Sequence, residues 1–230
     1  LAGLADTQVA AFTTSQIQNF TATALSALDA AQAGALTTTQ IAALKTTQVS
    51  AFDATDMGEL SATQVGAFTA AQIGRLTTDA VGALDAAQVG AWNTTQVRAL
   101  TTTQISALSA TDVAELTTTQ IAALNTSQIA ALSDTNVTEL ADTQIAALTN
   151  AQVQSLSTTI INSLADTQIA AFTTGQIAAL SSSQAASLTE TSIGALTETQ
   201  AGAMTATQIA ALSTDAASAF EQTHIAAMNT

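Results

Sequence analysis

The sequence contains no cysteine, no proline and no tyrosine, and only one histidine, His224. The absence of cysteine excludes disulfides, thiol nucleophiles and thiolate metal sites, and a single histidine excludes a multi-histidine metal centre. Only three lysine and arginine residues stand against 17 aspartate and glutamate residues, so the net charge is -14. Such a surface does not neutralise nucleic-acid phosphates and is not attracted to anionic lipid. We therefore expect no nucleic-acid partner.

Long apolar runs are lacking as well. Hydrophobic residues make up 47% of the chain, which is too many for a solvated disordered tail. Clusters of threonine and glutamine interrupt the apolar residues about every eight positions, so the stretch of roughly 18 apolar residues that a membrane helix needs is absent. We expect a folded chain without membrane insertion.

An eight-residue repeat runs through the whole chain. A large apolar residue stands at every eighth position from Leu4 to Met228, at all 29 positions and without one slip. We number the octad from the residue after this apolar residue, so that Thr37 is position 1, Gln40 is position 4, Ile41 is position 5 and Leu44 is position 8. Because no insertion or change of composition interrupts the repeat, we expect one repeat domain over residues 1–230.

A period of eight fits no single regular element. On a straight α-helix the apolar stripe would rotate by about 80° per octad and would leave any one partner. A coiled coil needs a period of seven or eleven. A β-strand would send positions 5 and 8 to opposite faces of a sheet.

The polar half of the octad predicts a new helix start in every repeat. Position 1 is threonine, serine, aspartate or asparagine in 24 of 29 octads, and position 4 is glutamine in 19 of 28. This spacing is the capping box, in which the position 1 side chain accepts a hydrogen bond from the position 4 N–H and the glutamine reaches back. We predict helices of about seven residues, one per octad. Position 1 departs from this pattern at five residues: Ala5, Lys45, Ala141, Ala165 and Glu221.

Helices this short are unstable alone, so they must stack on neighbouring repeats as in a solenoid. The sequence thus predicts an all-α solenoid with positions 5 and 8 in the core and with position 6, often glycine, close to the next coil. The breaks in the position 4 glutamine are 24 or 32 residues apart up to residue 216, which predicts three to four octads per superhelical turn. These breaks are Ala24, Asp56, Ala80, Asp112, Asn136, Ile160, Ser192, Ala216 and His224.

Candidate catalytic residues are scarce. His224 stands at a glutamine position, where it can replace the cap, and the serines and threonines have no base beside them for nucleophilic catalysis. We therefore expect no enzyme. Asp53, Asp56 and Glu59 are spaced three apart and are a candidate for weak Ca²⁺ binding through oxygen ligands. The alternative interpretation is a solvated acidic face without a cofactor.

Individual octads resemble a known type of array. The segments Leu116–Leu124 (Leu-Thr-Thr-Thr-Gln-Ile-Ala-Ala-Leu) and Leu140–Leu148 (Leu-Ala-Asp-Thr-Gln-Ile-Ala-Ala-Leu) are similar to the Leu-Thr-x-x-Gln-Ile-x-Ala repeats of large secreted bacterial surface proteins, often labelled adhesin-like or haem-utilisation-like. The resemblance covers essentially the whole chain. It implies export and a structural role outside the cell or on its surface, and it transfers no functional residue. A haem role has no support in a chain with one histidine and no tyrosine.

Two functions follow as hypotheses. The first is a structural protein that forms or extends an extracellular filament, surface layer or adhesin stalk, with self-association into a homopolymer by end-to-end and lateral packing. The uniformity of the repeat favours it, whether the chain is a stretch of a longer protein or stacks on other copies. The alternative is a binding module that presents regular threonine and alanine to ice or polysaccharide. The outward threonines for that surface are Thr39, Thr47, Thr63, Thr103 and Thr119.

Overall fold

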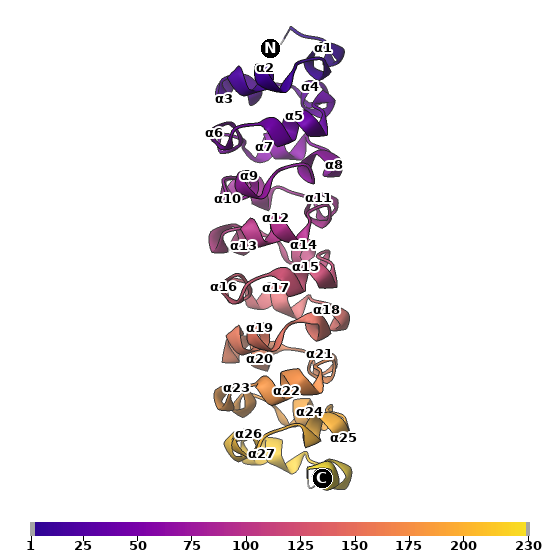
Figure 1. Cartoon of the computed structure of the whole chain (residues 1–230). Helices are drawn as coiled ribbons and strands as arrows, with labels where there is room; N and C mark the ends of the chain where they lie inside the picture. Colours follow the sequence, from indigo (N-terminus) through magenta and orange to yellow (C-terminus); the bar gives the residue numbers. More distant parts are fainter. Residues whose placement is uncertain (1–2, 229–230) are drawn as a thin grey trace. The chain divides into compact units, whose positions relative to one another are not determined.

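The computed structural model describes residues 3–228, which form 28 short α-helices, one per octad, and no strand. Its contacts divide the chain into unit 1, Leu1–Leu124, and unit 2, Asn125–Thr230, and each unit is described by itself (Figure 1). The predicted all-α repeat solenoid is confirmed in both units, whereas the single domain over residues 1–230 stays a prediction.

The helices are numbered so that helix n carries residue 8n at octad position 4. Unit 1 contains α1 (Asp6–Ala10), α2 (Thr14–Asn19), α3 (Ala22–Leu25), α4 (Ala30–Ala35), α5 (Thr38–Ala43), α6 (Thr46–Val49), α7 (Ala54–Gly58), α8 (Ala62–Val65), α9 (Ala70–Ile73), α10 (Thr78–Gly82), α11 (Ala86–Gly90), α12 (Thr94–Ala99), α13 (Thr102–Ala107), α14 (Ala110–Ala114) and α15 (Thr118–Ala123). Unit 2 contains α16 (Thr126–Ile129), α17 (Asp134–Thr138), α18 (Asp142–Ala147), α19 (Asn150–Ser155), α20 (Thr158–Ser163), α21 (Asp166–Ala170), α22 (Thr174–Ala179), α23 (Ser182–Ala186), α24 (Glu190–Gly194), α25 (Glu198–Gly202), α26 (Ala206–Ala211), α27 (Thr214–Ser218) and α28 (Gln222–Ala227).

Each helix begins at the predicted cap. Thr37 has extended backbone angles (φ -72°, ψ 156°), and its hydroxyl accepts from the N–H of Gln40 while the Gln40 side chain accepts from the N–H of Thr37. The helices that lack a side-chain cap bond begin after the five residues that depart from the position 1 pattern: Ala5, Lys45, Ala141, Ala165 and Glu221. The corner is therefore made by the cap residue itself, without a glycine at positive φ anywhere in residues 3–228.

The helices are shorter than predicted, with four to six residues in place of about seven. The reason lies at position 8, where the large apolar residue often leaves the helix. Leu44, for example, has φ -57° and ψ 142°. Two successive extended residues, at positions 8 and 1, thus turn the chain and leave at most positions 2 to 7 for the helix.

Stacking of every third helix builds the core within each unit. Helix α2 packs on α5 and α9 packs on α12 in unit 1, and α19 packs on α22 in unit 2. Positions 5 and 8 fill the interior as predicted, with Ile41, Leu44 and their equivalents buried. Because each short helix contacts only nearby repeats, stability is the sum of many similar interfaces.

The position 4 glutamines join successive coils through a buried ladder of hydrogen bonds. The Nε2 of Gln72 donates to the carbonyl oxygens of Ile41 (2.9 Å) and Leu44 (2.7 Å), which lie 31 and 28 residues earlier. The same two spans recur in unit 2, where Gln208 donates to Ile177 (2.8 Å) and Leu180 (2.7 Å). One coil therefore takes about three and a half octads, within the predicted range of three to four.

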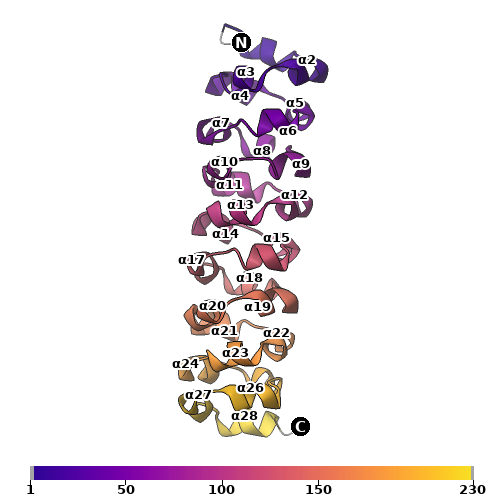
Figure 2. The same ribbon diagram turned by 90° about the vertical axis from the view of Figure 1, so that its left-hand side faces the viewer.

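A half-integral turn fixes which helices lie on the same side of a unit. After two coils, about seven octads, a given position returns to the same side, so helices n and n+7 form a column. In unit 1, α3 with α10, α4 with α11 and α7 with α14 are such columns, and both views agree (Figures 1 and 2).

Position 6 approaches the following coil, as predicted from its small residues. A Cβ on Gly202 would lie 2.9 Å from the carbonyl oxygen of Ala227, and one on Gly66 would lie 3.0 Å from that of Ala91. Not every glycine at position 6 has this role, because Gly58, Gly90 and Gly194 meet nothing within 4 Å.

We expect Gln72→Met to lower the free energy of unfolding by about 2–4 kcal/mol, because two carbonyls and the Thr69 N–H lose their partner inside the protein. Gln16→Met is the matched control. Gln16 has the same octad position but is exposed in the first coil, so we expect a loss below about 1 kcal/mol. Urea denaturation followed by circular dichroism checks both, and equal losses would contradict the ladder.

Candidate functional site

The ladder is interrupted where position 4 is not glutamine, and these interruptions are the least regular places in the fold. At Asp56 the carboxylate accepts from the N–H of Asp53 (3.0 Å), as a glutamine oxygen does. It has no N–H to donate to the carbonyls of Leu25 and Leu28, which lie 31 and 28 residues earlier. The capping half of the interaction is kept and the half that joins the coils is lost.

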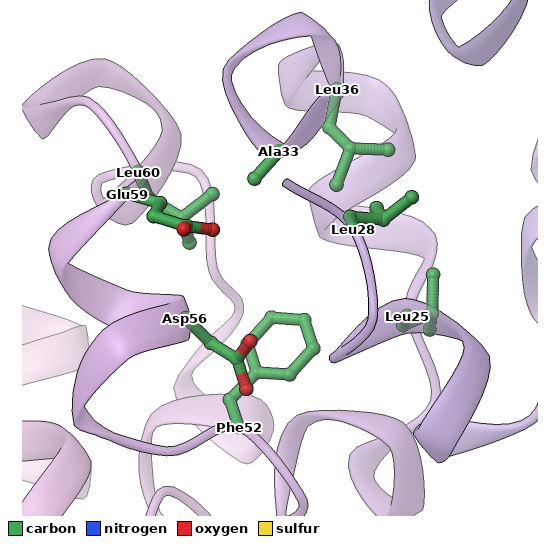
Figure 3. A pocket seen from close by; sticks show the side chains of 8 residues that line it. All are labelled: Leu25, Leu28, Ala33, Leu36, Phe52, Asp56, Glu59 and Leu60. Carbon is green, nitrogen blue, oxygen red and sulfur yellow. The ribbon is translucent and has the colours of Figure 1, made fainter. Parts of the chain in front are cut away.

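A cavity in unit 1 lies at this interruption. Figure 3 shows the carboxylates of Asp56 and Glu59 pointing toward the space that separates α7 from the Leu28 to Leu36 segment. The remaining lining is apolar and consists of Leu25, Leu28, Ala33, Leu36, Phe52 and Leu60. Two carboxylates in an apolar setting make this the most distinctive local environment described in the chain.

Electrostatics in this cavity work against ionisation. Burial raises the pKa of Glu59, and the nearby charges of Asp56, Asp29 and Asp53 raise it further. Carboxylates that share one sign disfavour each other's charged form. The arrangement attracts protons.

The predicted calcium ligands do not come together as a set. Asp56 and Glu59 share the cavity, whereas Asp53 is exposed and uses its carboxylate to cap α7, accepting from the N–H groups of Thr55 and Asp56. Within residues 3–228 no group of three or more aspartate, glutamate or histidine side chains is placed to hold a metal ion. Weak Ca²⁺ binding by Asp56 and Glu59 alone stays an untested prediction.

Asp112 is the most buried carboxylate of the ladder. It is 4% exposed, and its Oδ2 accepts from the N–H (2.9 Å) and the hydroxyl (2.6 Å) of Ser109. Like Asp56, it caps its own helix and cannot donate to the previous coil, whose register places the carbonyls of Val81 and Leu84 there.

His224 takes over both glutamine roles. Its Nδ1 accepts from the N–H of Glu221 (3.2 Å), and its Nε2 lies 2.9 Å from the carbonyl oxygen of Leu196, 28 residues earlier. This geometry requires the tautomer with the proton on Nε2. The structure thus places the only histidine as a cap surrogate and ladder member.

Trp92 has an unusual environment that sequence reasoning missed. It stands at position 8 in the core of unit 1, and its indole Nε1 is buried without a hydrogen-bond partner in the described part of the chain. We have no structural explanation for this orphaned donor.

The threonines of the ice-binding alternative are exposed but divided among columns. Thr47 and Thr103 stand on the α6/α13 column, Thr63 and Thr119 on the α8/α15 column, and Thr39 on α5. These five residues therefore do not form one rank on a single side of unit 1. The alternative function has no further support from their placement.

Comparison with known proteins supports a repeat array. The ALTTAQ repeat family matches residues 81–110, 110–142 and 145–182, so the central part of the chain is similar to that family. None of the curated proteins that were compared matches the chain. Among the described helices, none has the length and apolarity to span a bilayer. The chain is thus similar over its middle to ALTTAQ repeats.

We expect Asp112→Gln to raise the free energy of unfolding by about 1–3 kcal/mol, because the new amide supplies the missing donor to the carbonyls of Val81 and Leu84. Asp79→Asn removes one charge from an exposed position of the neighbouring α10 and controls for electrostatic relief. Chemical denaturation of both variants checks this. The same gain in both would show that charge, and not the ladder, is responsible.

Glu59 gives a pH dependence of defined sign. Because its folded pKa is raised, the folded chain binds this proton more tightly than the unfolded chain, and stability rises as the pH falls through that pKa. We expect Glu59→Gln to be more stable than the parent at pH 7, with a difference that shrinks toward pH 4. Unfolding measured across this range checks it, with Glu115→Gln, the same octad position in α14, as control. A difference independent of pH would contradict it.

Proposed function

We propose that the protein is structural and forms or extends an extracellular filament, surface layer or adhesin stalk by end-to-end and lateral packing of its repeats. The single observation that carries the proposal is the sameness of the coil-to-coil contact. Gln72 in unit 1 and Gln208 in unit 2 make the same pair of bonds to the preceding coil, within about 0.1 Å. A further coil can therefore be added with no new kind of contact.

The outermost coils support the end-to-end part. In the first coil of unit 1, Gln8 and Gln16 are exposed. Their oxygens accept from the N–H groups of their own caps, and their Nε2 groups have no acceptor among the described residues. In the last coil of unit 2, Ile225 is 51% exposed, whereas Ile193 at the same octad position is fully buried.

These two surfaces carry complementary groups. One offers amide donors beside apolar rings, and the other offers position 5 and position 8 carbonyls beside apolar side chains. Further octads of a longer protein or a second copy can pair them, and both extend the solenoid. The extracellular setting rests on the resemblance to secreted surface arrays and on the cysteine-free, acidic composition.

The double variant Gln8→Glu/Gln16→Glu tests this mode of assembly. Each glutamate keeps an oxygen for the cap and removes the N–H donor, and the added charges oppose carbonyl oxygens. We expect the parent chain to assemble with rising concentration and the variant to need at least about tenfold more protein. Sedimentation velocity and negative-stain electron microscopy measure this.

Thr7→Glu/Ser15→Glu is the control, since it adds the same charges to exposed position 3 of the same helices. It should assemble as the parent does. A parent chain that stays monomeric at all concentrations would refute the proposal, and equal weakening by both variants would refute pairing through the glutamines.

A further inference from the structure

The interruptions of the ladder lie on one side of each unit. In unit 1 they occur in α3, α7, α10 and α14, and in unit 2 in α17, α20, α24, α27 and α28. With three and a half octads per coil, these helices occupy only three neighbouring columns out of seven. Figure 2 shows α7, α10 and α14 along one edge of unit 1, and α17, α20, α24 and α27 along one edge of unit 2.

The acidic residues follow the same columns and one adjacent column. We call these four columns the acidic face: α3, α4, α6, α7, α10, α11, α13 and α14 in unit 1, and α17, α18, α20, α21, α24, α25, α27 and α28 in unit 2. Their octads carry all acidic residues of the chain except Asp6. Lys45 is the one lysine or arginine among them.

The other three columns form what we call the low-charge face: α1, α2, α5, α8, α9, α12 and α15 in unit 1, and α16, α19, α22, α23 and α26 in unit 2. Every octad of this face has glutamine at position 4. Its only charged residues are Asp6, Arg75 and Arg98 in unit 1, and in unit 2 it has none. The side of each unit that is free of net negative charge is thus also the side with the unbroken ladder.

We propose that a second copy of this chain packs on the low-charge face, with the acidic faces left in solvent. This inference rests on the proposed function and assigns its lateral contact to one surface. Charge decides the orientation, because acidic faces of two copies repel and charged residues are depleted from the centres of protein interfaces. The low-charge face brings hydroxyls, amides and methyl groups together without like charges.

The available surface is sufficient. The chain exposes 9954 Å² in all, and a three-sevenths share, even halved for a single unit, exceeds the roughly 800 Å² that each partner buries in a standard interface. The exposed side chains on this face are mostly threonine, serine and alanine, which lose little conformational entropy when ordered. The unbroken ladder holds them at fixed spacing.

Paired substitutions at exposed position 3 of unit 2 test the assignment. Ala151→Asp/Thr207→Asp adds two charges to the α19/α26 column of the low-charge face, and Thr135→Asp/Thr191→Asp adds the same two to the α17/α24 column of the acidic face. All four residues are exposed. We expect the first pair to abolish lateral bundles in negative-stain images while filaments still lengthen, and the second pair to leave bundles as in the parent.

Single cysteines give an independent measurement, because the chain has none. Thr207→Cys should react with a bulky maleimide about tenfold more slowly after assembly, and Thr135→Cys should react at an unchanged rate. Filaments that never associate laterally, bundles lost only with the acidic-face pair, or protection of residue 135 alone would overturn this inference and leave the proposed function standing. A parent chain without any assembly would overturn both.

Discussion

The glutamine side chain at position 4 is the interaction on which the rest of the structure depends. Helices of four to six residues leave many backbone groups without partners inside the helix, and they cannot persist alone. The glutamine oxygen satisfies the N–H of its own cap, and its Nε2 satisfies carbonyls of the preceding coil, as Gln72 does for Leu44. One amide thereby closes a helix start and spaces two coils.

Much of this fold was predictable from local chemistry. The cap positions, the five helices without a side-chain cap and the buried positions 5 and 8 follow from residue types at fixed spacing. The second role of the glutamine was missed, although the sequence holds a signal for it. A capping box accepts glutamate as readily as glutamine, yet no octad has glutamate at position 4. A carboxylate caps a helix but cannot donate to the next coil.

Two features could not be read from the sequence. Helix length depends on whether position 8 turns out of the helix, which tertiary packing decides at residues such as Leu44. The half-octad offset between coils depends on how the side chains at positions 5 and 8 interlock, and no local pattern encodes it. For this reason Asp53, Asp56 and Glu59 suggested one ligand set, whereas the structure brings only Asp56 and Glu59 into one cavity.

The half-octad offset explains how one repeat can carry two different faces. Departures from the consensus that look scattered along the chain, such as Asp56 and Asp112, return to the same column every two coils. An octad that lacks its glutamine is held by intact neighbours, because stability in a stacked repeat is shared among adjacent interfaces. Positions 2 and 3 take no part in the ladder, so charge there can vary without disturbing the stacking. Surface chemistry on one side of a unit can therefore change while the contact that builds the coils stays the same.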